Sequence, residues 1–135
     1  MTGEGTSAEQ PGAARTDTRY PPAVRIRRGS DIRGLFSRGK RSRTRHLDVV
    51  FAASPVSHPR FGLVVPKHRH RIVDRNLLKR RLREIGRREV LPRLRERGVE
   101  VDLLVRARRE AYGAEFEDLR RELVEFVERT WSDAS

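Results

Sequence analysis

A run of cationic side chains with helical spacing begins near Asp74 and carries the clearest chemistry in this sequence. At 100° per residue, one row of side chains repeats every four residues and a second row lies beside it. The two rows consist of Arg75, Asn76, Lys79, Arg80, Arg83 and Arg87. Like charges four residues apart destabilise an isolated helix, so a ridge without interleaved carboxylates indicates that phosphates bind on it. Arg offers a planar fork of donors for phosphate, and Lys offers a point charge. A merely solvated helix face is the alternative interpretation.

A second candidate site combines an aromatic ring with a basic stretch. Phe36 follows Ile32 by one helical turn, and the basic segment 40–45 comes soon after it. An aromatic ring stacks on any nucleobase and contributes about 1–3 kcal/mol per base. We expect Val50 to lie beside the ring, and Lys40, Arg41 and Arg43 to hold the nucleic-acid backbone. The alternative is that Phe36 is an ordinary core residue of an amphipathic helix.

The sequence gives little support for catalysis by the protein itself. It has no cysteine, which excludes disulfides and thiolate zinc sites. Its histidines (His46, His58, His68 and His70) have no carboxylate pair nearby, so we interpret them as solvated side chains rather than metal ligands. We place Glu100 and Asp102 on the polar face of a strand, in structural roles. No Gly-rich phosphate loop or Ser-His-Asp set can be placed, so we predict no catalytic residue and no metal bound by the protein.

The net charge indicates a polyanionic partner. The chain has 31 Lys and Arg against 19 Asp and Glu, a formal net charge of +12, and a basic excess of this size is typical of nucleic-acid-binding proteins. Residues 1–112 contain 28 basic and 12 acidic side chains, whereas the last 23 residues contain 3 and 7. We therefore expect one basic face and a C-terminal element turned away from it. With no long apolar run and no signal-peptide pattern, we expect a cytoplasmic protein with neither a membrane nor a small-molecule partner.

The hydrophobic pattern predicts one α+β domain over 23–131, after a disordered tail over 1–22 and before a short end over 132–135. The tail has almost no apolar residues to bury. The strands alternate apolar and polar residues, and the last helix carries an apolar stripe. The expected elements are a helix from a Ser30 cap to Gly39, strands over 46–53 and 61–65, a long helix from an Asp74 cap to about Arg88, a strand over 99–106 and a helix over 116–131.

Two of these segments together resemble the ribonuclease P protein family. The strand Phe61-Gly62-Leu63-Val64-Val65-Pro66-Lys67 is followed, after a basic loop, by Arg75-Asn76-x-x-Lys79-Arg80-x-x-Arg83-Glu84. This pair of segments is similar to the family's strand and Arg-Asn helix signature. The upstream segment Ser30-Asp31-Ile32-x-x-Leu35-Phe36-x-x-Gly39 is similar to the family's first helix, and the resemblance extends over about 23–131.

The resemblance implies a fold with element order α-β-β-β-α-β-α, in which a four-stranded sheet packs with three helices. It also implies a left-handed β-α-β crossover, whereas connection statistics alone favour a right-handed one. The implied function is that of the protein subunit of ribonuclease P, an endoribonuclease that removes the 5′ leader of precursor tRNA. In that holoenzyme the catalytic RNA binds Mg and performs the hydrolysis. The Arg-Asn helix would contact the catalytic RNA, and a cleft between the first helix and the sheet would bind the leader through Ile32, Phe36, Lys40, Arg41, Arg43, Val50 and Lys67.

The sequence also departs from the family pattern. Leu77 stands where the family usually has an Arg, Pro66 and His68 replace a Ser and a Lys beside Lys67, and Ile32 replaces one of two aromatic residues in the cleft. From the residues alone, a non-catalytic structured-RNA-binding protein, such as a ribosomal protein, remains an alternative. A helix-turn-helix DNA-binding protein is disfavoured because strands flank the basic helix, and a protein-only nuclease is disfavoured because no carboxylate cluster appears.

Overall fold

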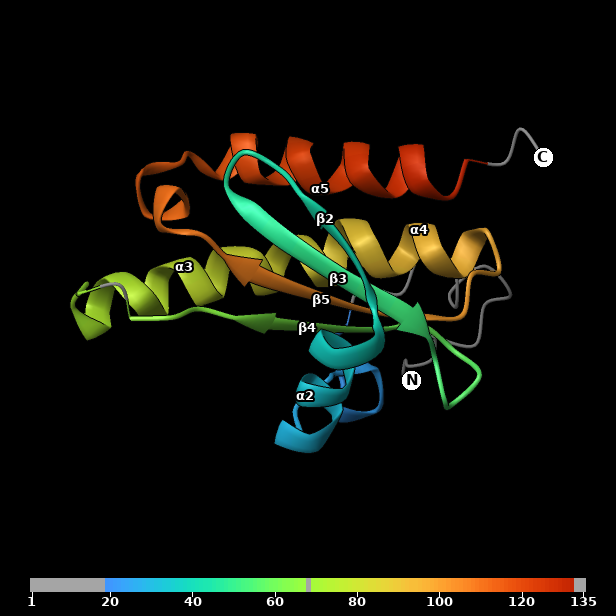
Figure 1. Ribbon diagram of the computed structural model, residues 1–135. Coiled ribbons are helices and arrows are strands. Elements are labelled where there is room, and N and C mark those ends of the chain that lie inside the picture. The colour runs from blue at the N-terminus through green and yellow to red at the C-terminus, as the bar shows by residue number, and fades with distance from the viewer. Residues whose placement is uncertain (1–18, 68, 133–135) are drawn as a thin grey trace, which may run out of the picture.

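The computed structural model describes residues 19–67 and 69–132, and these form an α+β domain around a four-stranded sheet. Figure 1 shows α2 against one side of the sheet and α3, α4 and α5 on the other. In chain order the elements are η2 (Pro22–Val24), α2 (Gly29–Arg38), β2 (Lys40–Arg43), β3 (Leu47–Ala53), β4 (Arg60–Val64), α3 (Ile72–Ile85), the π-helical turn η3 (Gly86–Val90), α4 (Leu91–Glu96), β5 (Val101–Ala107), η4 (Arg109–Gly113) and α5 (Phe116–Thr130). With α3, η3 and α4 taken as one interrupted helix, the predicted element order is confirmed.

The strands lie in the order β2-β3-β5-β4. β3 pairs antiparallel with β2 and β5, whereas β4 and β5 are parallel. Parallel neighbours need a crossover connection, and α3 to α4 supply it. The left-handedness of this crossover remains a prediction from the family resemblance.

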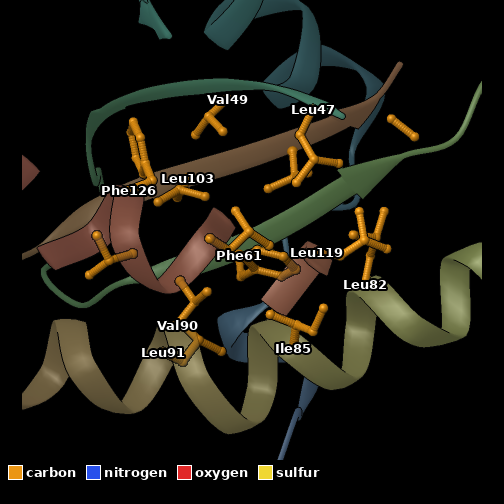
Figure 2. Packing of buried hydrophobic residues seen from close by; sticks show 14 of the residues in the cluster. Leu47, Val49, Phe61, Leu82, Ile85, Val90, Leu91, Leu103, Leu119 and Phe126 are labelled. Carbon is orange, nitrogen blue, oxygen red and sulfur yellow. The ribbon is translucent and has the colours of Figure 1, made fainter. Parts of the chain in front are cut away.

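Strand alternation divides the buried residues between two clusters. The larger one lies between the sheet and the helices α3, α4 and α5, and Figure 2 shows Leu82 and Ile85 pointing from α3 toward the sheet that carries Phe61. The smaller cluster lies on the other face, where α2 packs, and comprises Ile26, Leu35, Val50 and Leu104. Because successive side chains on a strand point to opposite faces, Val49 and Val50 belong to different clusters.

The long helix is interrupted where it passes closest to the sheet. Gly86 begins the π-helical turn η3, and a Cβ atom at this position would lie 2.2 Å from the Phe61 ring. Only glycine allows this approach without displacing the ring. Pro92 stands in the first turn of α4, where a missing N–H is tolerated, so α4 begins as a second helical segment. Gly98, with φ at +66°, follows the end of α4.

Several local boundaries differ from the sequence-based expectations. α3 begins at Ile72 rather than at an Asp74 cap, and Asp74 lies in its first turn. α2 begins at Gly29 with Arg28 at the cap position, so Ser30 is already helical. At each of these helix starts an Arg with extended backbone occupies the cap position, and no side chain caps the helix. The last helix buries Phe126, whereas Phe116 at its start is exposed.

The folded part also begins before the predicted boundary at residue 23. Tyr20, which the sequence placed in the tail, donates a hydrogen bond of 2.6 Å to the carbonyl of Phe61 and packs edge-on against its ring. Burial raises the pKa of the Tyr20 hydroxyl to about 12. Residues 1–18, the rest of the predicted tail, and residues 133–135 lie outside the described part of the chain.

Two polar contacts tie distant elements together. His46 is buried and bonds through Nδ1 to Glu122 of α5, whose carboxylate also accepts a hydrogen bond of 2.7 Å from Thr44. The expectation that His46 is solvated is therefore wrong, because α5 covers the turn between β2 and β3. On the other face, Asp102 is 2% exposed and accepts two hydrogen bonds, of 2.9 and 2.7 Å, from Arg60. The structural role expected for Asp102 is confirmed.

Within residues 19–67 and 69–132, no helix has the length and apolar character needed to cross a membrane.

Candidate nucleic-acid interface

The cationic side chains of α3 and of the following turn η3 form a surface that we call the helix ridge, and fewer of them face solvent than the sequence suggested. Its members are Arg75, Asn76, Lys79, Arg80, Arg83 and Arg87. Asn76, Arg80 and Arg83 are exposed and lie opposite the buried side chains of Leu78 and Leu82. Lys79 is half-buried between the two faces. These four side chains form the solvent-facing part of the ridge.

The other two members of the helix ridge interact with the protein itself. Arg75 lies against Tyr112 of η4, and its Nε is buried without a hydrogen-bond partner among the described residues. Burial raises the pKa of Tyr112, and the charge of Arg75 partly opposes that rise. Arg87 forms a fork-like pair with Glu84, at 3.1 and 3.0 Å. The sequence missed this pair because Glu84 was taken as part of the signature, although it stands at the i, i+3 spacing of a helical ion pair.

A groove beside α2 brings together four of the residues predicted to bind the leader. It has a volume of about 310 Å³, and we call it the α2 groove. Its lining consists of Phe36, Arg41, Ser42, Arg43, Asp48, Val50 and Arg106. The register explains the convergence, because Arg41 is opposite Val50 and Arg43 is opposite Asp48, and all four point to the face that α2 covers only in part.

Cations surround the Phe36 ring in this groove. The guanidinium carbons of Arg41 and Arg106 lie 5.5 and 6.0 Å from the ring centroid, within the range of cation–π attraction. Arg41 also donates a hydrogen bond to the Phe36 carbonyl, which links β2 to α2. Arg106 was missed as a site residue, although its alternation with buried neighbours on the last strand places it on the polar face.

The role of Phe36 in packing is limited. The ring is half-buried and packs at the margin of the small cluster, whereas Leu35 is fully buried beneath α2. The ring therefore contributes to the cluster and also lines the groove. The two interpretations of Phe36, as a base-stacking residue and as a core residue, are therefore compatible.

The three remaining residues of the predicted leader set lie elsewhere. Ile32 packs into the small cluster and is absent from the groove lining. Lys40 is opposite Phe51, so it points to the other face of the sheet and lines a cavity with Trp131. The prediction missed this because neighbouring residues on a strand cannot share a face. Lys67 is exposed in the segment after β4, also outside the groove lining.

The described lining of the α2 groove carries a net positive charge, because it contains three Arg side chains and one carboxylate, that of Asp48. Arg43 pairs with Asp48 at 3.0 Å, with both side chains partly exposed to solvent. Such an exposed pair contributes little stability. Arg41 and Arg106 remain directed at the ring, so the groove combines a stacking surface with cations suited to a phosphate backbone.

The histidines and acidic residues do not assemble into a metal centre in the part of the chain that the structure describes. No group of three or more His, Asp or Glu side chains in this part could hold a metal ion. His70 stacks on Tyr112 with ring centroids 3.7 Å apart, and the Nδ1 of His58 lies 3.2 Å from the carbonyl oxygen of Pro59. His68 lies outside the described residues.

The chain is similar to known proteins over nearly all of this domain. The family model described as Ribonuclease P matches residues 20–131. The ribonuclease P protein component of Pseudarthrobacter chlorophenolicus is 34% identical over 107 residues, covering 78% of this chain and 76% of that protein. The corresponding protein of Syntrophobacter fumaroxidans is 41% identical over 70 residues, 52% of this chain. That match spans 59% of its length, and a match to the Syntrophus aciditrophicus relative spans 53%.

The fold agrees with solved structures of the same kind. The structure of the RNase P protein from Thermotoga maritima superposes with a TM-score of 0.65 at 26% identity, covering 78% of this chain and 96% of that one. An RNase P protein structure from Staphylococcus aureus has a TM-score of 0.64 at 22% identity. The matched region contains both the α2 groove and the helix ridge, and the chain belongs to the ribonuclease P protein family.

Proposed function

We propose that this chain is the protein subunit of ribonuclease P, which binds the catalytic RNA on the helix ridge and the 5′ leader of precursor tRNA in the α2 groove. The observation that carries the proposal is the position of the Phe36 ring, which lines an open groove between the guanidinium groups of Arg41 and Arg106. A base paired within a duplex has no free face to offer such a ring. The groove therefore suits a single strand.

The chemistry of the groove explains how a leader of any sequence would be accepted. Every nucleobase has a π-face, so stacking on Phe36 does not select a base. The surrounding Arg side chains bind phosphates, which are the same at every nucleotide. No backbone donor or acceptor is needed for recognition, and the expected result is affinity without sequence preference.

The helix ridge supplies a second, separate surface for the catalytic RNA. The solvent-facing cations Lys79, Arg80 and Arg83 point away from the sheet, and the apolar side of α3 is held in the core by Leu78 and Leu82. Asn76 adds an amide that can donate and accept. A rigid, core-anchored helix can present these groups to an RNA helix without loss of order in the protein.

In this proposal the catalytic RNA performs the hydrolysis and would hold the Mg that the reaction requires. The protein contributes positive charge close to two RNA backbones, which lowers their mutual repulsion. Its effect should therefore be greatest at low magnesium, where few counterions screen the phosphates.

The test is reconstitution with the catalytic RNA and a precursor tRNA at low magnesium, with the cleavage rate as readout. The full chain should increase the rate, and Arg80→Ala should weaken binding of the catalytic RNA without changing the melting temperature, because the side chain is exposed. Arg121→Ala, on the acidic helix α5, is the matched control. RNA binding without stimulation of cleavage would instead favour a structured-RNA-binding protein such as a ribosomal protein.

A further inference from the structure

A second basic cavity lies on the opposite flank of α2 from the α2 groove. Its volume is about 490 Å³, and we call it the Arg27 cavity. On α2, Asp31 and Phe36 lie on either side of the buried Leu35. Asp31 lines the Arg27 cavity, and Phe36 lines the α2 groove. The Arg27 cavity is lined by Pro22, Ala23, Arg25, Arg27, Arg28, Asp31, Pro55, Val56, His58 and Arg60.

One guanidinium group of this cavity is held in place by the core. Arg60 has a side chain only 13% exposed, and two of its nitrogens donate to the buried carboxylate of Asp102. The third nitrogen, Nη1, lies 3.8 Å from Asp31 at the cavity. A fixed donor of this kind binds an anion without the entropy cost of ordering a long side chain.

Two further guanidinium groups have no anionic partner within the part of the chain that the structure describes. Arg27 and Arg28 are exposed, and within residues 19–67 and 69–132 neither forms a hydrogen bond or an ion pair through its side chain. Arg25 is held differently, because its Nε donates to the carbonyl of Tyr20 at 2.8 Å. Four guanidinium groups thus line one cavity, whereas Asp31 is the only carboxylate among its described lining residues.

We infer that the Arg27 cavity binds phosphodiester groups of RNA, with Arg27 and Arg28 each contacting one phosphate. The inference rests on the proposed function, because an RNA bound in the α2 groove would pass close to α2. Two RNAs carry such phosphodiester groups. One is the leader after it has crossed α2, and the other is the catalytic RNA bound next to the protein. An α-helix with its side chains is about 10–12 Å across, so a leader would reach the cavity only a few nucleotides beyond the groove.

The test uses the double variant Arg27→Gln/Arg28→Gln in the reconstituted holoenzyme. We expect several-fold weaker RNA binding and a flatter plot of log affinity against log salt. The slope should change by about 1.4 if the two lost phosphate contacts are on a single strand, and by about 1.8 if they are on a duplex. The conservative variant Arg27→Lys/Arg28→Lys should retain part of the affinity, because Lys keeps the charge and loses the planar fork. Melting curves should be unchanged, since both side chains are exposed.

The matched control removes the same charge elsewhere. The control is the double variant Arg121→Gln/Arg129→Gln. Both residues are on α5 and line neither the α2 groove nor the Arg27 cavity, so the salt dependence should be almost unchanged. If the two double variants bind RNA equally well, the loss reflects net charge alone and the inference is overturned. Equal affinity of the Arg27→Gln/Arg28→Gln variant and the unmodified protein would overturn it as well.

Two further arms identify the source of the phosphate and separate the inference from the proposed function. A defect that appears only with longer leaders assigns the phosphate to the leader, and a defect with the catalytic RNA alone assigns it to that RNA. Phe36→Ala is measured in parallel. If Phe36→Ala reduces leader affinity and the cavity variant behaves like its control, the inference about the cavity fails and the proposed function stands. If Phe36→Ala has no effect on the leader, the proposed function itself fails.

Discussion

Replacing Phe36 by alanine tests the central feature of the α2 groove. The change removes the ring that lines the groove and leaves the cations around it in place. We expect weaker binding of precursor tRNA that carries a 5′ leader and almost no change for mature tRNA. Stacking of one base on an aromatic side chain contributes about 1–3 kcal/mol, which corresponds to roughly a 5-fold to 150-fold rise in Kd.

The structural cost of the same change is bounded by the position of the ring. A fully buried Phe costs about 3–5 kcal/mol when replaced by alanine. The Phe36 ring is half-buried at the edge of a cluster whose fully buried members are Leu35 and Leu104, so the free energy of unfolding should fall by less than this range. Ile32→Phe is the complementary change. Because Ile32 packs in the cluster and is absent from the groove lining, the larger side chain should give little gain in leader affinity.

The assay compares the Kd values of leader-bearing and leaderless tRNA for the holoenzyme, with a urea unfolding curve for each variant. The ratio of the two Kd values isolates the leader contribution, since both tRNAs share every other contact. An equal loss of affinity for both tRNAs, together with a fall in stability of 3 kcal/mol or more, would refute the assignment of Phe36 to the leader.

Three further predictions concern the packing and polar contacts of buried residues. Gly86→Ala should destabilise the protein by about 1–3 kcal/mol in urea unfolding, because the new Cβ would meet the Phe61 ring; a gain in stability, the usual result of this change in a helix, would contradict the close approach. Arg60→Ala should cost about 3–5 kcal/mol, because the carboxylate of Asp102 is left buried and unpaired, and replacing both residues by Leu should cost less than the single change. Between pH 10 and 12 the unfolded chain loses the Tyr20 proton while the folded protein, with its Tyr20 pKa raised to about 12, retains it. The free energy of unfolding should therefore fall as the pH rises through this range, and Tyr20→Phe should show a smaller fall, measured by unfolding at each pH.

The sequence by itself determined the features that depend on neighbours along the chain. Alternation over 46–53 predicted a strand, and helical spacing predicted a long helix that carries the cationic side chains. The structure has β3 over Leu47–Ala53 and α3 over Ile72–Ile85. The family followed from the motif around Arg75 and Asn76, and the full order of elements, with β2 as a fourth strand, followed from the resemblance to that family. Periodicity predicts such features because it reflects the geometry of a single helix or strand.

Only the tertiary structure decided which side chains from different elements share a site. Pairing of Lys40 with Phe51 turned Lys40 to the far face, and pairing of β3 with β5 brought Arg106 to Phe36. Nothing near His46 in the sequence indicates that Glu122, 76 residues away, would bury it. The physical reason is that register and packing depend on contacts between elements far apart in the chain. A one-residue shift in register moves a side chain to the other face, and local spacing does not determine that register.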